Sequence, residues 1–536
     1  MKKLSVETIA FGVVLFLGLL PVLFCDYIVT GDGPCHLYNS KIFLSWVFEG
    51  QKEFFKPFYQ LNQFIEPNWI TNAIQIPLLK WFPVIWTEKL FFGFYILVFS
   101  FGFRKVIAAI NPESVFLACI GVLFAWNMVL MKGFTNNAWS IALWFWILAY
   151  WIKAIPNPSA FASFRMAMLL FLQYLSHPMG FFISLFSIGC VVLIVGWYDL
   201  REKGAVTVLR FYLDQIWRLL VSIIAPVILF LQFFLRRDWN AEAQHVSKLD
   251  LWNDLLHLKA LITLSNQERI ILLLLSIMIL YLFSLTLFQR IRKKAFVRYD
   301  GFMLLFLSVL SLFIFPPTSF SGGLEIGIRL GIFPFLCLLF WIATNDFSAR
   351  IRNGVSIAAV LFALILTMIR LPIQVKASSY ASEIVTCADH IQDTSTLLVL
   401  NYDWAGKTPD GKVIADAIWL FPHVDCYLGA YKNLVISDNY ETNFWYFPMV
   451  ERWETNMYSQ TDKDGINFDH RPPRADINNY KGRTGQYLDY VLMLSYSTEF
   501  EAHPYTQEIF TQLDAEYEKV FTSEHARAIL YRRTKY

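Results

Sequence analysis

Apolar runs long enough to cross a bilayer dominate the first 370 residues of this chain. A hydrocarbon core of about 30 Å is spanned by a helix of roughly 20 residues. Eleven such runs stand at 7–26, 87–103, 114–131, 136–152, 162–177, 180–197, 217–235, 270–288, 301–316, 327–344 and 354–370. Because hydrophobic residues make up 56% of the whole chain, we predict a polytopic α-helical membrane protein with about eleven transmembrane helices.

Lysine and arginine residues gather at alternate connections between these runs, beginning with Lys2 and Lys3. Short connections that are rich in basic residues stay on the cytoplasmic side. The N-terminus is therefore placed in the cytoplasm, and an odd number of spans exports the C-terminus. No small-residue cleavage site follows the first run, which we keep as a permanent span. The expected location is a bacterial inner (cytoplasmic) membrane.

The composition changes sharply after residue 370. Residues 371–536 hold 15 Lys and Arg against 23 Asp and Glu, whereas residues 1–370 hold 30 against 19. A basic membrane part suits contact with anionic membrane lipids and phosphates. Strand patterns at Thr396–Asn401, Tyr490–Ser495 and Ala528–Arg532 are interleaved with helical ones. We predict a transmembrane domain over 1–370 and a soluble extracytoplasmic α/β domain over 371–536.

The first exported connection, residues 27–86, is long and carries an ionisable group beside the membrane. Its segments Lys41–Phe48 and Ile70–Phe82 are apolar but too short to cross, and are expected to be interfacial helices. Asp32 opens the loop, and Pro34 is typical of the first turn of a helix, whose positive end favours a carboxylate. An acid so close to the bilayer carries a solvation cost, which makes Asp32 a functional-site candidate. The alternative is that Asp32 caps the helix.

The Asp-Gly-Pro-x-His stretch at residues 32–36, directly after the first span, resembles the GT-C superfamily of integral membrane glycosyltransferases. The long exported loop, the number of spans and the exported C-terminal domain resemble that group as well. It includes protein mannosyltransferases, lipid A aminoarabinose transferases and bacterial oligosaccharyltransferases. The resemblance implies a polyprenyl-phosphate-linked sugar as donor, a lipid, glycan or protein as acceptor, and Asp32 as general base. His36, expected to hydrogen-bond Asp32, and Glu66, a second acid, complete the predicted catalytic set.

Further residues are assigned to substrate binding. A leaving phosphate needs a cation, and Arg329 at the exported mouth of the tenth run is the first candidate. The alternatives for Arg329 are snorkelling to the interface or pairing with Glu325. The other predicted donor phosphate-binding residues are Arg269, Arg236 and Arg237. The predicted substrate-binding residues are His177, Asn136, Asn137 and Tyr38. His177 equally suits helix termination, and a pair such as Asn136 with Asn137 more often only makes a turn.

The sequence has few motifs that would bind a metal or another cofactor. The exported loop has no Asp-x-Asp pair, so we expect a metal-independent protein, with Asp32 and Glu66 as the ligands if Mg or Mn is bound. A Walker loop and a strand-linked Gly-x-Gly-x-x-Gly are both absent, so a nucleotide cofactor and a nucleic-acid partner are not expected. Among the seven cysteines, Cys25 with Cys35 or Cys387 with Cys426 are candidate disulfides, and free thiols are the alternative.

Two other functions compete with the transferase. A lipid-linked oligosaccharide transporter or flippase would use internal symmetry and charges in mid-membrane, whereas the charges of this chain gather at the ends of the runs. A membrane-anchored carbohydrate-binding scaffold would tolerate Asp32→Asn with little loss. The aromatic run at 439–448, which follows His423 and Asp425, is a candidate acceptor surface. That run suits sugar stacking or packing in a core.

Overall fold

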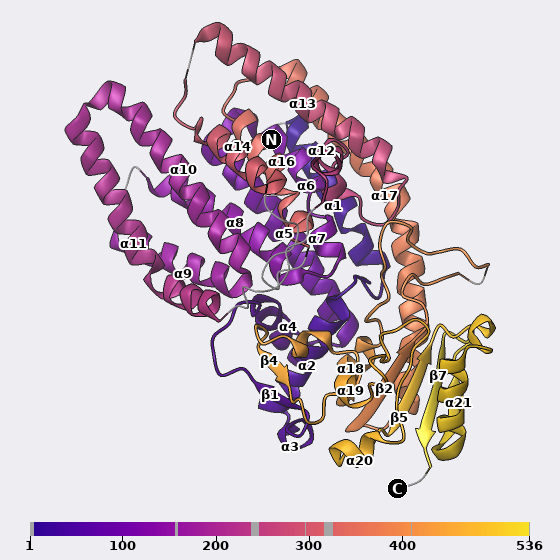
Figure 1. The fold of residues 1–536 in the computed structure, drawn as a ribbon. Helices are drawn as coiled ribbons and strands as arrows, with labels where there is room; N and C mark the ends of the chain where they lie inside the picture. Colours follow the sequence, from indigo (N-terminus) through magenta and orange to yellow (C-terminus); the bar gives the residue numbers. More distant parts are fainter. Residues whose placement is uncertain are drawn as a thin grey trace. The chain divides into compact units, whose positions relative to one another are not determined.

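The computed structural model describes residues 5–155, 159–236, 246–294, 296–315, 325–408 and 410–534. The chain divides into two compact units, which are described separately (Figure 1). The helical unit comprises Met1–Leu20, Gly93–Leu130 and Thr135–Arg370, and the mixed unit comprises Pro21–Phe92, Met131–Phe134 and Leu371–Tyr536. The long connection after the first helix therefore groups with the C-terminal segment.

Each of the eleven apolar runs coincides with helical structure. Seven segments of the described chain are long and apolar enough to span a membrane, and three further apolar helices are shorter. A multi-pass helical membrane protein is thus confirmed, while the number of eleven crossings stays a prediction. The helices wholly or partly in the helical unit are α1 (Val6–Phe24), α5 (Val84–Ile110), α6 (Ala118–Leu123), α7 (Met128–Met131), α8 (Thr135–Ala154), α9 (Ala160–Ser176), α10 (Pro178–Lys203), α11 (Ala205–Leu235), α12 (Lys248–Leu256), α13 (Glu268–Lys293), α14 (Gly301–Ile314), α15 (Ile326–Leu330), α16 (Phe333–Ile342) and α17 (Ala349–Val385), with 3-10 turns η1 (Pro112–Leu117) and η2 (Lys259–Leu261).

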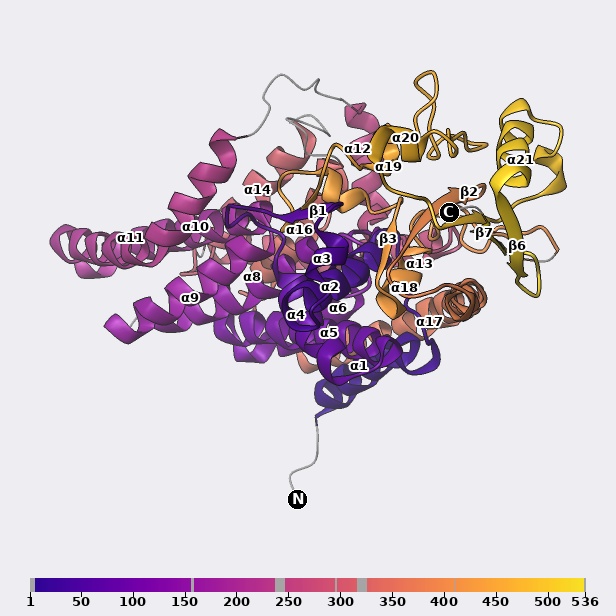
Figure 2. The ribbon, with the colours of Figure 1, turned by 90° about the horizontal axis from the view of Figure 1, so that it is seen from below.

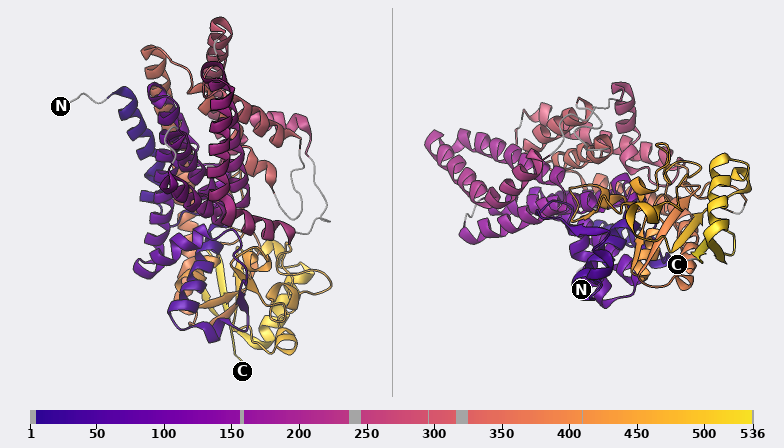
Figure 3. Two further views of the ribbon diagram at one scale, coloured as in Figure 1. Left: turned by 90° about the vertical axis from the view of Figure 1, so that its left-hand side faces the viewer. Right: turned by 60° about the horizontal axis from the view of Figure 1, so that its bottom comes forward.

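Aromatic packing forms the core of the helical unit. The rings of Phe103 and Phe145 meet edge to face at 5.4 Å, and Phe340 stacks on Phe103 at 5.3 Å. Trp144 packs on Phe340 and is fully buried. The helices α8, α9, α10 and α11 pack side by side (Figure 1, Figure 3). Large apolar residues of α11 stay exposed, including Trp217 and Ile224, as expected of side chains that face hydrocarbon.

A buried ion pair joins the start of α13 to α17. Glu268 is fully buried, and its carboxylate accepts from the backbone N–H groups of Thr263, Leu264 and Ser265. The guanidinium of Arg370 donates to the same carboxylate at 2.7 and 3.0 Å. These bonds satisfy a charge that would otherwise be costly to bury.

Glu268→Gln is expected to destabilise the protein by about 3–5 kcal/mol, because it leaves the Arg370 cation buried without its counter-ion. The thermal unfolding midpoint in detergent should fall clearly. Asp254→Asn is the matched control, since Asp254 pairs at 2.9 Å with the exposed Lys259, and exposed pairs contribute about 0–1 kcal/mol. Equal midpoints for both variants would contradict this expectation.

The mixed unit contains a five-stranded sheet with the order β3-β2-β5-β7-β6 (Figure 2). β2 pairs in parallel with β3 and β5, whereas β7 runs antiparallel to β5 and β6. Every residue of β2 and β5 is buried, which explains their continuous apolar sequence. Helix α21 packs against β6. The three predicted strands are thus confirmed as β2, β5 and β7, the central strands of the C-terminal sheet.

The first loop belongs to the same folded unit as this sheet. Its strand β1 pairs antiparallel with β4, and its helix α2 packs against α4 and α18. The strands are β1 (Tyr59–Leu61), β2 (Ser395–Asn401), β3 (Leu434–Ile436), β4 (Met449–Glu451), β5 (Tyr490–Leu494), β6 (Tyr517–Thr522) and β7 (Ala528–Arg533). The helices are α2 (Gly33–Phe48), α3 (Lys52–Phe55), α4 (Ile70–Trp81), α18 (Cys426–Tyr431), α19 (Met457–Gln460), α20 (Tyr480–Thr484) and α21 (Pro504–Glu516), with η3 (Thr386–His390), η4 (Tyr440–Asn443) and η5 (Thr498–Phe500). Most of α2 is buried, because it is an internal helix of this unit.

Candidate active site

Asp32 immediately precedes α2, in a backbone position held by the short segment 131–134. Gly31 and Asp32 donate their backbone N–H groups to the carbonyls of Met131 and Lys132 at 3.0 Å. Gly133 has a φ of +84°, and a Cβ atom there would come within 2.2 Å of the Asp32 nitrogen. Only glycine therefore permits this close approach.

The side chain of Asp32 does not cap α2. The Asp32 carbonyl oxygen accepts from Cys35 and His36, while the carboxylate makes no capping hydrogen bond. Instead, Oδ1 lies 3.8 Å from Nε2 of His423, and the Tyr440 hydroxyl donates to the carboxylate. The Asp32 side chain keeps 18% of its surface exposed. It is thus held by partners while part of its surface stays exposed.

His423 lies between two carboxylates. Its Nδ1 is 3.0 Å from Oδ2 of Asp438, on the side opposite the Nε2 that faces Asp32. Its ring stacks on Tyr440 at 4.7 Å. Burial disfavours the charged imidazole, but Asp438, Asp32 and Asp425 outweigh it and raise the pKa of His423 to about 10. His423 is therefore an imidazolium at neutral pH.

The ionisation of Asp32 is set by opposing effects. Burial raises the pKa of its carboxyl above the ordinary value, and Glu441 raises it further. His423, Tyr440 and His36 act in the opposite direction and favour the carboxylate. A carboxylate with a raised pKa is a stronger base, provided that neighbouring cations keep it ionised.

His36 pairs with a different acid from the one expected. Its Nδ1 lies 2.6 Å from the buried Glu441, not on Asp32, which corrects the sequence-based interpretation. Burial opposes its charged form, but Glu441 and Asp32 raise the pKa of His36. Glu441 also accepts from Asn39 at 3.0 Å. The His36–Glu441 pair forms because η4 brings Glu441 onto α2, which the local sequence could not reveal.

Tyr38 and Glu66 occupy buried positions. Tyr38 is fully buried, donates to the carbonyl of Leu434 at 2.6 Å and accepts from the N–H of Ile436 at 3.1 Å. It therefore anchors α2 to β3, and its predicted substrate contact stays a prediction. Glu66 is 1% exposed and lies between β1 and α4. Its catalytic role and its role as a metal ligand also stay predictions.

The helical unit brings several predicted residues close to one another. His177 lies between α9 and α10, and its Nε2 is 3.4 Å from Nη1 of Arg329. The carbonyl of Asn136 accepts from Ser176 at 2.8 Å, which places the buried first turn of α8, including Asn137, beside the end of α9. The remaining predicted arginines are spread out: Arg269 is in the first turn of α13, Arg236 follows α11, and Arg237 lies outside the described residues.

His423, Asp438, Asp425 and Tyr440 are absent from the predicted site. The His-x-Asp pattern at 423–425 was visible beside the aromatic run, but nothing local connected it with Asp32. Asp425 is fully buried, and burial, followed by the charge of Asp438, raises its pKa well above the ordinary value. Asp425 therefore belongs to the same buried acid cluster as Asp438 and His423.

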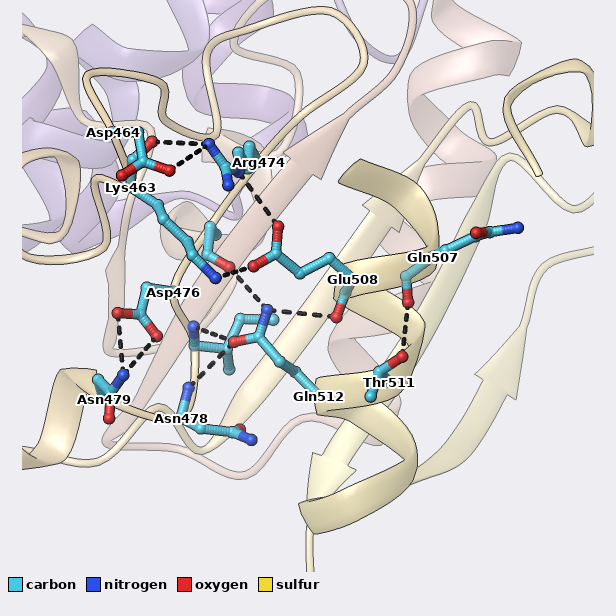
Figure 4. Close-up of polar contacts among 12 residues, drawn as sticks. Lys463, Asp464, Arg474, Asp476, Asn478, Asn479, Gln507, Glu508, Thr511 and Gln512 are labelled. Atoms are coloured by element: carbon cyan, nitrogen blue, oxygen red, sulfur yellow. Dashed lines mark hydrogen bonds and ion pairs between the residues drawn. The ribbon is translucent and has the colours of Figure 1, made fainter. Parts of the chain in front are cut away.

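The segment from Thr461 to Asn479 brings Asp469 and Arg471 near the same cluster. Both groups interact electrostatically with Asp438. Glu508 of α21 holds this segment through ion pairs with Lys463 and Arg474, and Gln512 accepts from the Ile477 N–H at 2.7 Å (Figure 4). The segment that carries Asp469 and Arg471 is thus held against helix α21 of the sheet domain. Within the described residues, no group of three or more His, Cys, Asp or Glu is arranged to hold a metal ion.

The fold and this site are those of a multi-pass membrane protein. An acid in the loop after the first span folds into the same compact unit as the C-terminal sheet. No protein-family model and no curated protein matches the sequence. The apo structure of ArnT from Cupriavidus metallidurans, a GT-C aminoarabinose transferase, is similar over 98% of this chain and 97% of that chain, with a TM-score of 0.53 and 9% identity. The structure of ArnT bound to undecaprenyl phosphate aligns over the same shares, with a TM-score of 0.45 and 10% identity. The chain has an ArnT-like, GT-C-like fold.

Proposed function

We propose that this protein is a glycosyltransferase that moves a sugar from a polyprenyl-phosphate-linked donor to an acceptor at the extracytoplasmic membrane face. The observation that carries the proposal is the Asp32 carboxylate, which leaves the helix cap unused, faces the His423 imidazolium and keeps a reachable surface. The ArnT-like fold supports the reaction class. Fold alone does not define chemistry, so the proposed function is inferred from the residues of the site.

The proposed reaction is a displacement at the anomeric carbon of the donor. An acceptor hydroxyl attacks that carbon, and Asp32 takes the hydroxyl proton as the new bond forms. The bond between the anomeric carbon and the phosphate oxygen breaks, and the polyprenyl phosphate leaves with the electron pair. Its departure needs no proton, only positive charge.

His423 acts as a positioning residue in this scheme. Because Asp438 and Asp425 keep it protonated, it cannot take the acceptor proton itself. Its positive charge instead favours the ionised form of Asp32. The sheet domain would thus control whether the loop acid is a base.

We assign the leaving phosphate to Arg329, with His177 as its neighbour. Their contact of 3.4 Å supports a shared role, because two nitrogen-bearing side chains converge at the α9–α10 junction. Arg269 and Arg236 are the second choices. Guanidinium groups suit phosphates because they donate two parallel hydrogen bonds.

The direct test uses purified protein in lipid nanodiscs and a panel of polyprenyl-phosphate-linked sugars. We expect release of polyprenyl phosphate, detected by mass spectrometry, from at least one donor when acceptor lipids or glycans are present. EDTA is expected to leave the release unchanged. A flippase would move the donor across the bilayer intact, and a scaffold would bind it intact. Either result would overturn the proposal.

A further inference from the structure

Two cysteines from distant parts of the chain meet beside the candidate site. Sγ of Cys35, in the first turn of α2, lies 3.1 Å from Sγ of Cys426, the first residue of α18. Both side chains are fully buried, and both thiols contact the carbonyl oxygen of Asp438, at 3.5 and 3.6 Å. All seven cysteines are free thiols in the structure, so neither Cys25–Cys35 nor Cys387–Cys426 is joined there, and each of those candidate disulfides contains one member of this contact.

We propose that Cys35 and Cys426 form a disulfide that covalently joins α2 to α18 in the mature protein. The thiols are already in contact across a packed helix interface, so little displacement is needed to bring the sulfurs to bonding distance. The remaining five cysteines are also buried as free thiols.

The reaction is a thiol–disulfide exchange with an external disulfide. The two thiols lose two protons and two electrons, the Sγ–Sγ bond forms, and the oxidising disulfide is reduced to two thiols. Extracytoplasmic compartments supply protein disulfides of this kind. Burial raises the pKa of both thiols, and exchange requires a thiolate. The bond is therefore formed while α2 and α18 are still docking, and is protected from reductants afterwards.

The cross-link would hold the Asp32–His423 contact together. Asp32 stands three residues before Cys35, and His423 stands three residues before Cys426. The bond would also link positions that are 391 residues apart, and closing a long loop restricts the unfolded chain strongly. This inference depends on the proposed extracytoplasmic location of the mixed unit, but it does not depend on glycosyl transfer.

The first experiment counts thiols in the full-length protein isolated from membranes. After denaturation without reductant, alkylation is expected to modify five of the seven cysteines, and reduction should expose the other two. Peptide mapping should find the Cys35 and Cys426 peptides joined, with the mass of two thiol peptides less two hydrogens. Seven alkylated thiols, or a different joined pair, would overturn the proposal.

The second experiment uses variants to test the structural effect. Reductant applied during unfolding should lower the thermal midpoint of the wild type and of Cys190→Ala, whose side chain is buried in α10 of the helical unit. It should leave the midpoint of the Cys35→Ser/Cys426→Ser double variant unchanged. An equal response of all three proteins would contradict the proposal. A joined pair in a protein without transferase activity would reject only the proposed function.

Discussion

Asp32→Asn is expected to abolish glycosyl transfer while the protein still folds. The amide has the size of the carboxylate but cannot accept the acceptor proton, and loss of a general base typically costs roughly 10²–10⁴-fold in rate. The backbone contacts of Asp32 with segment 131–134 do not involve its carboxylate. The measurement is the initial rate of polyprenyl phosphate release at saturating donor, alongside the thermal unfolding midpoint.

The matched control is Asp26→Asn, six residues earlier in the chain. Asp26 forms an ion pair with Lys89 at 3.2 Å, and its side chain is 60% exposed. This variant is expected to keep the wild-type rate within about twofold, because exposed pairs contribute little. Full activity of folded Asp32→Asn would remove Asp32 from the role of base.

His423→Gln is expected to move the acidic limb of the pH–rate profile to higher pH. The His423 imidazolium lowers the pKa of Asp32, so its removal raises that pKa and leaves less carboxylate at neutral pH. The rate near pH 7 should fall and should recover in part as the pH increases, because the carboxylate is the form that acts as a base. A residue that only supported the fold would lower the rate at every pH without moving the profile.

The same variant has a predicted effect on stability. The pKa of His423 is raised from 6.5 to about 10 in the folded protein, so its stabilising contribution is fully present below pH 6.5 and is lost as the pH rises through about 10. Across this window, the thermal midpoint of the wild type should decrease more than that of His423→Gln. His525→Gln is the control, because His525 also pairs with a carboxylate, Glu383, at 3.0 Å. If the thermal midpoints of His423→Gln and His525→Gln change identically with pH, His423 is not an imidazolium coupled to Asp32.

The sequence was most informative where the physical cause was local. The length of an apolar run against bilayer thickness predicts where helices form, and each predicted run coincides with helical structure, because backbone groups in hydrocarbon must bond within their own segment. The continuous apolar stretches of β2 and β5 reflect burial on both faces of the sheet. Asp32 stood out for the same kind of reason, as an acid placed directly after a membrane span.

The partners of Asp32 depended on contacts between residues far apart in the chain. His36 was expected beside Asp32 because both belong to one turn of helix, but Glu441 lies closer to its ring nitrogen. Tyr38 was predicted to bind substrate, yet it is fully buried and bonds to β3. Neither outcome has a sequence signal, because each depends on how the C-terminal segment folds onto α2.

By itself, the amino-acid sequence determined the membrane class, the positions of the helices and central strands, and the acid that opens the first loop. Only the tertiary structure decided that His423 lies beside that acid, that Asp438 lies on the other side of the His423 ring, and that the thiols of Cys35 and Cys426 meet. Helix and strand patterns arise from burial along a short stretch of chain. The ionisation of Asp32 and His423 depends on charges that lie a few ångströms apart, and a disulfide between Cys35 and Cys426 depends on the distance between their sulfurs. In both cases the two residues are far apart in the sequence, so local patterns do not reveal the contact.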